Sequence, residues 1–112
     1  MALSLVTAPA AEPITLAEAK VHLRVDITDD DSLITALIVT ARQHVEAITR
    51  RALITQTWDL TLDAWPDGDT ILVPLPPLQS VTSVTYKDSA GTVYTVPATD
   101  YIVDKVEEPG RI

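Results

Sequence analysis

The longest hydrophobic pattern in the chain lies between residues 30 and 51, where apolar side chains recur at steps of three and four. That spacing places them on one face of a helix. We therefore predict a long helix from about Asp30 to Arg51, preceded by a short helix that ends near Arg24. Thr15 and Glu18 have the spacing of a capping box, which marks the start of the short helix. The apolar stripe of the long helix consists of Leu33, Ile34, Leu37, Ile38, Ala41, Val45 and Ile48.

After Leu53 the pattern changes to an alternation of apolar and polar residues, which is typical of strands with one buried face. Trp58 alternates with the buried positions, so we expect it in the core. Asp88 to Gly91 has the composition of a hairpin loop. The order predicts an α+β domain, with two N-terminal helices, one short and one long, followed by a small antiparallel β-sheet of about five strands. The strand patterns cover residues 54–63, 70–73, 80–87, 92–96 and 101–106.

The length of 112 residues suits one domain. We expect residues 1–13, which are rich in Ala and Pro, to form an extended lead-in. Residues 14–112 are expected to form a single domain, with helices at about 15–51 and strands at about 53–106. The last two residues look like the start of a further segment, so we expect the full protein to continue beyond residue 112.

The chain is strongly acidic: it has sixteen Asp and Glu residues against eight Lys and Arg, which gives a net charge of −8. Such a chain lacks the basic footprint of proteins that bind phosphate backbones, and we expect it to repel duplex DNA rather than grip it. There is no cysteine, which excludes disulfides and thiolate metal sites. No apolar run is long enough to cross a membrane, and the N-terminus lacks the pattern of a signal peptide.

Few residues suggest chemistry. His22 and His44 are the only histidines and belong to no zinc or nucleophile motif. Asp26 and Asp29 to Asp31 lack the glycine and glutamate spacing of a calcium loop, so we expect these acids to cap the long helix. The sequence therefore predicts no catalytic residue, no metal and no cofactor. A metal-dependent enzyme that uses Asp26–Asp31 with His22 is the least favoured alternative.

Seven residues are candidates for contacts with another subunit or partner. Arg42, Arg50 and Arg51 are candidates for contact with an acidic neighbouring copy. Arg50 and Arg51 could instead serve only to stabilise the end of the long helix, and the sequence favours neither interpretation. Trp65 precedes a proline and is expected at a rim or interface. The segment from Leu72 to Leu78 is either a connector that covers the core or a docking segment for a neighbouring subunit. The candidates are Arg42, Arg50, Arg51, Trp65, Leu75, Pro76 and Pro77.

An ordered series of segments resembles the head–tail connector (adaptor) proteins of tailed bacteriophages, including relatives in prophages and gene transfer agents. The most distinctive segment is LPPLQSVTSVTY, within ILVPLPPLQSVTSVTYKDSAGTVYTVP. The resemblance extends from about Thr15 to Ile112. The other segments are ITLAEAKVHLRV, DDDSLITALIVTARQHVEAIT, RALITQTWDLTL and DYIVDKVEEPGRI.

The resemblance implies a structural virion protein, made in the bacterial cytoplasm, that lies at the head–tail junction. Twelve copies of it would form a ring under the portal protein. The ring would extend the DNA channel and dock a stopper or tail-completion protein. DNA would pass through without sequence-specific binding, and the acidic second half of the chain suits that passage. The alternative is a non-viral interaction module that binds a partner along the Pro-rich edge of residues 72–78.

Overall fold

Both predicted helices are present in the computed structural model, which describes all 112 residues. α1 spans Leu16–Leu23 and begins after Thr15, whose hydroxyl accepts a hydrogen bond from the Glu18 N–H at 3.1 Å. α2 spans Asp31–Thr49. Both helices therefore begin and end within two residues of the predicted positions, because their signals are local. α2 is the longer of the two, but no helix in the structure combines the length and the apolar character that a membrane span needs.

The acids before α2 do not cap it in the predicted way. Asp30 is the N-cap residue, but its side chain makes no capping hydrogen bond. Its backbone (φ −103°, ψ 9°) lies outside the extended region from which a side chain usually reaches the first free N–H groups. Asp31 instead accepts a hydrogen bond from Lys20 Nζ at 2.7 Å, which ties α1 to the start of α2.

A strand that was not predicted precedes the helices. β1 (Ala2–Thr7) pairs antiparallel with β2 (Thr57–Thr61), so the order of two helices followed by all strands is wrong. The register places Leu3 opposite Leu60 and Leu5 opposite Trp58, which gives the pair one apolar face. Trp58 is nevertheless 36% exposed, so its predicted place in the core is also wrong. The reason is that two strands form too small a sheet to enclose a large side chain.

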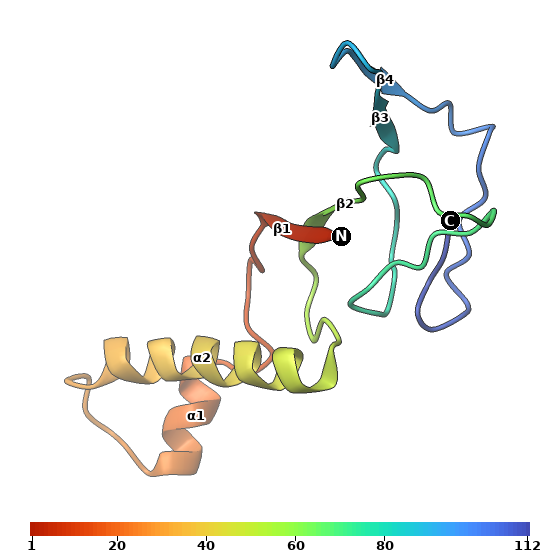
Figure 1. Cartoon of the computed structure of the whole chain (residues 1–112). Helices are drawn as coiled ribbons and strands as arrows, with labels where there is room; N and C mark the ends of the chain where they lie inside the picture. The colour runs from red at the N-terminus through yellow and green to blue at the C-terminus, as the bar shows by residue number, and fades with distance from the viewer. The chain divides into compact units, whose positions relative to one another are not determined.

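The structure divides into two compact units, Met1–Leu62 and Asp63–Ile112, and each is described by itself. Figure 1 shows α1 crossing α2 in the first unit and a hairpin in the second. This hairpin joins β3 (Thr85–Lys87) to β4 (Val93–Thr95), as predicted. The Asp88 carboxylate holds its loop by accepting the N–H groups of Ala90 and Thr92, each at 2.9 Å. Gly91 supplies the left-handed backbone (φ 86°) that the loop requires.

The remaining predicted strands are reduced to isolated bridges, so four strands in two sheets replace one sheet of about five. Arg111 pairs with Leu72 on one side and with Asp104 on the other. The prolines after Val73 cannot donate ladder hydrogen bonds, which stops the strand there.

The hydrogen bond from the Val106 N–H, and then that from Arg111, lower the pKa of the Asp104 carboxyl. This carboxylate therefore stays ionised and fixes the last turn of the chain.

Arg42 connects three segments of the first unit. Its Nε donates to Glu12 Oε2 at 2.5 Å and its Nη1 to Glu46 Oε2 at 2.8 Å. The other oxygen of Glu46 accepts hydrogen bonds from the Leu53 N–H at 2.9 Å and from Gln56 Nε2 at 2.8 Å. The hydrogen bond with Glu12 raises the pKa of the Arg42 guanidinium, which keeps it charged. The segment before α1 and the chain after α2 are thus both fastened to one side of α2.

We expect Arg42→Met to lower the free energy of unfolding by about 2 kcal/mol, because two carboxylates lose a charged hydrogen-bond partner where little water reaches them. Lys20→Met is the matched control. Its ion pair with Asp31 is more exposed (17% and 33%, against 7% for the Arg42 side chain), so the loss should be about 0.5 kcal/mol. Urea unfolding followed by circular dichroism measures both. Equal losses would contradict the role assigned to Arg42.

A second substitution tests the packing of the second unit. Gly110 is buried, and a Cβ added there would lie 2.5 Å from Leu78 Cβ. Gly110→Ala should therefore destabilise the protein by about 1–3 kcal/mol through overpacking. Gly68→Ala is the control, because no atom lies within 4 Å of the added Cβ. Calorimetry should show a lower melting temperature for the first variant alone, and an unchanged value for both would be the contrary result.

Candidate interaction surfaces

The fold leaves most of its apolar side chains exposed. Ile34, at 5% exposure, is the only hydrophobic residue that is buried. The chain of 12.1 kDa has an accessible surface of 8555 Å². A compact monomer of that mass exposes about 6,000 Å², and two separate compact units of half the mass would together expose about 7,300 Å². So much uncovered apolar surface is typical of a subunit that buries it against neighbours.

The first candidate surface is a hollow between α1 and α2, which we call the helical groove. Its volume is about 400 Å³, and its lining is almost entirely apolar. Five of the seven residues in the predicted stripe of α2 line this groove, which the first unit leaves open; Leu33 and Ile48 do not. Leu37 is 55% exposed there, whereas Ile38 is half-buried. Apolar residues that line the groove include Ile14, Leu23, Leu37, Ile38, Val45 and Leu53.

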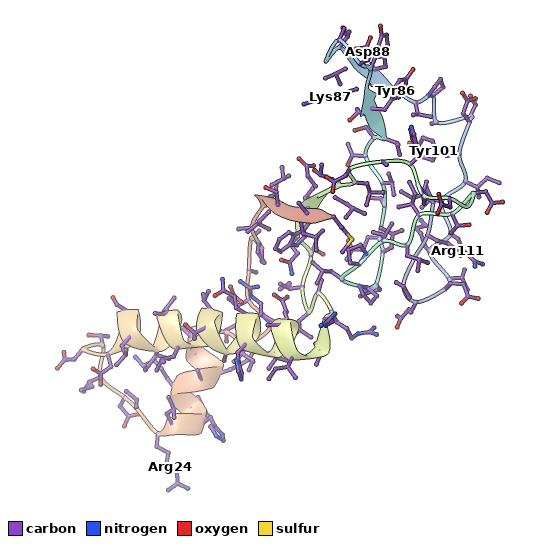
Figure 2. The ribbon with its side chains drawn as sticks, in the orientation of Figure 1. Arg24, Tyr86, Lys87, Asp88, Tyr101 and Arg111 are labelled. Carbon is purple, nitrogen blue, oxygen red and sulfur yellow. The ribbon has the colours of Figure 1, made fainter.

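The second candidate surface is an aromatic cluster on the second unit, formed by Trp65, Tyr86 and Tyr94. The two tyrosines lie opposite each other on the hairpin and stack with ring centroids 5.3 Å apart. The Trp65 ring lies 6.3 Å from that of Tyr86. All three side chains are exposed, and Figure 2 shows Tyr86 on the hairpin beside Lys87 and Asp88. Exposed aromatic side chains of this kind are frequent anchors of protein interfaces.

The predicted interface residues lie in both units. Arg42 is buried between its two carboxylates, whereas Arg50 is exposed at the end of α2 and Arg51 is half-buried. Trp65, in the second unit, is 61% exposed, as expected for a rim residue. The segment around Leu75, Pro76 and Pro77 is bent rather than extended, with Leu75 at φ 59°, so it offers no straight edge for a Pro-rich docking mode. The interface role of all seven residues stays a prediction.

Sequence reasoning missed two features of these surfaces. Tyr86 lies two residues before the predicted loop and Tyr94 three residues after it, and this near-equal spacing is the signal for their pairing. The second feature is that both helices end on an arginine in the left-handed conformation, Arg24 at φ 57° and Arg50 at φ 54°. Glycine is the usual residue there. Figure 2 shows Arg24 projecting from the end of α1.

No three His, Cys, Asp or Glu side chains lie close enough together to hold a metal ion. His22 lines the helical groove and His44 is exposed on α2. The groove and the aromatic cluster are apolar surfaces, and burying them against another apolar surface is favourable.

Comparison with solved structures finds a similar chain in a structure described as the neck of an empty gene transfer agent (GTA) particle, computed with C6 symmetry. The two chains are 30% identical and superpose with a TM-score of 0.83. The match covers 99% of this chain and 59% of the neck chain, so this chain spans little more than half of that protein's length. A search among curated proteins finds no match.

The sequence also matches a family model described as phage gp6-like head-tail connector protein, over residues 13–92. That range includes both helices, β2 and most of the hairpin. The resemblance drawn from the sequence segments is thereby confirmed. The chain belongs to the phage gp6-like head–tail connector family, the structural proteins of the head–tail junction in phages and phage-like particles.

Proposed function

We propose that this chain is a connector subunit whose copies form a ring under the portal protein. The ring extends the DNA channel and docks a stopper or tail-completion protein. The observation that carries the proposal is the uncovered apolar surface of a family member: the helical groove and the aromatic cluster are both exposed in the single chain. A closed ring buries such surfaces repeatedly, so modest contacts add up to a stable assembly.

The symmetry of the neck particle supports a ring. The similar chain comes from a neck computed with C6 symmetry. In C6 symmetry, copies are related by six-fold rotation about one axis, as they are in a ring. Six-fold symmetry alone does not give the number of copies of this chain, so the twelve copies expected from the resemblance stay a prediction. Counting subunits in electron micrographs of the assembled ring decides the number.

The charge distribution supports a passive DNA channel. Residues 63–112 carry three basic and eight acidic residues, a net charge of −5. Acids along a channel would repel the phosphates of the passing duplex, which lowers the chance that DNA adheres to the wall. We therefore place part of the second unit at the channel and expect no sequence-specific binding of DNA.

Mixing the purified chain with the portal protein from the same particle tests the proposal directly. Native mass spectrometry and negative-stain electron microscopy should find a ring-sized complex that contains several copies of this chain. A complex of one chain with one partner would contradict the ring and would support an ordinary interaction module instead.

A charge placed in the helical groove should weaken assembly without unfolding the subunit. Leu37→Asp is expected to raise the protein concentration needed for ring formation at least tenfold, on the order of 1.4 kcal/mol per contact. The melting temperature should change little, because Leu37 is already 55% exposed. Gln43→Asp adds the same charge on the opposite face of α2 and should leave assembly unchanged. Equal effects of the two substitutions on assembly would remove the groove from the contact surface.

A further inference from the structure

The two-stranded sheet of the first unit has two open edges. β1 pairs only with β2, and neither strand makes any other backbone hydrogen bond between Ala2 and Thr7 or between Thr57 and Thr61. β1 contacts no helix and no other strand, and all six of its residues are exposed. A sheet of two strands is marginally stable by itself. Each outer edge presents a row of unpaired N–H and C=O groups.

The outer edge of β1 lacks the devices that normally protect such an edge. Natural edge strands carry a lysine or other charge, a proline, or a strong bulge. β1 reads Ala-Leu-Ser-Leu-Val-Thr, with no charge and no proline. Its one irregularity lies between Leu5 and Thr7, at the end of the strand, so Ala2 to Leu5 is regular. An unprotected edge of this kind is a template for a further strand.

Charge points to a second copy as the source of that strand. Two chains of net charge −8 repel each other, so copies approach most easily through segments that carry no charge. Residues 1–11 contain no charged side chain, and β2 contains only Asp59. The two edges of the sheet also differ from each other, which is what a head-to-tail contact between identical subunits requires.

We infer that the outer edge of β1 in one copy pairs with the outer edge of β2 in the next copy. The sheets of neighbouring subunits then join into one continuous sheet around the ring axis. This inference depends on the ring that the proposed function requires, and it names the backbone contact that closes the ring. Every copy gives one edge and receives one, so no edge remains open in the closed assembly.

The pairing has a geometric consequence. Strands in a sheet lie about 4.8 Å apart, so each copy contributes about 10 Å to the circumference. Twelve copies, the predicted number, give a closed sheet about 115 Å around and about 37 Å across. A sheet of that width surrounds the ring axis and forms part of the inner wall.

Crosslinking of mixed variants tests the pairing, because the chain has no native cysteine. Ser4→Cys lies in β1 and Thr61→Cys in β2. The two variants carry C-terminal tags of different size and are mixed before assembly. A short bis-maleimide that spans about 8 Å, the separation of diagonal neighbours on adjacent strands, then links only cysteines of different copies. Gln43→Cys, on the exposed side of α2, replaces Thr61→Cys in the control mixture.

In assembled rings we expect the product that joins Ser4→Cys to Thr61→Cys to exceed the control product at least tenfold. Amide exchange of the unmodified protein provides a second measurement, in which residues 2–7 should exchange at least tenfold more slowly in the ring than in the free subunit. Rings that give no such product, or only links between two Ser4→Cys copies, overturn the inference while the proposed function stands. Unchanged exchange of residues 2–7 also overturns it. If no ring forms with the portal, the proposed function fails and the inference fails with it.

Discussion

The arrangement of the first unit depends on one guanidinium placed between two carboxylates. Arg42 lies in the middle of α2, and its partners come from the segment before α1 (Glu12) and from the next turn of α2 (Glu46). Because Glu46 also accepts the Leu53 N–H, the chain that enters the helices and the chain that leaves them are attached to the same side of α2. β1 and β2 therefore start from neighbouring points and can pair. Charged hydrogen bonds that little water reaches are strong enough to set such a geometry.

Local features of the fold were predictable from the sequence, and distant ones were not. The periodicity of α2, the Thr15 cap and the hairpin around Asp88 and Gly91 depend on residues within a few positions of each other. The pairing of β1 with β2 joins segments fifty residues apart, from Thr7 to Thr57. The alternation of Leu3 and Leu5 is too short to predict a strand there. Likewise, nothing in the sequence tells which of many carboxylates meets Arg42.

The candidate surfaces show the same division. Periodicity identified which face of α2 is apolar, but it cannot tell whether that face is covered, and the structure leaves Leu37 and Val45 exposed. The proline neighbour of Trp65 suggested a rim position, and the side chain is exposed, but its interface role stays a prediction. The contact of Trp65 with Tyr86, and the stacking of Tyr86 on Tyr94, were missed because the tyrosine pair depends on the hairpin register. A hydrophobic pattern thus marks surfaces that need a partner without saying where the partner comes from.

The separation of β1 from its partner strand β2 by fifty residues has a consequence for biosynthesis. At a translation rate of about 5–20 residues per second, the fifty residues between Thr7 and Thr57 take several seconds to make. During that interval the uncharged strand leaves the ribosome without its partner. Nascent chains on one polysome then carry identical unpaired strands close together. Premature association of these strands during translation is therefore the folding hazard of this subunit.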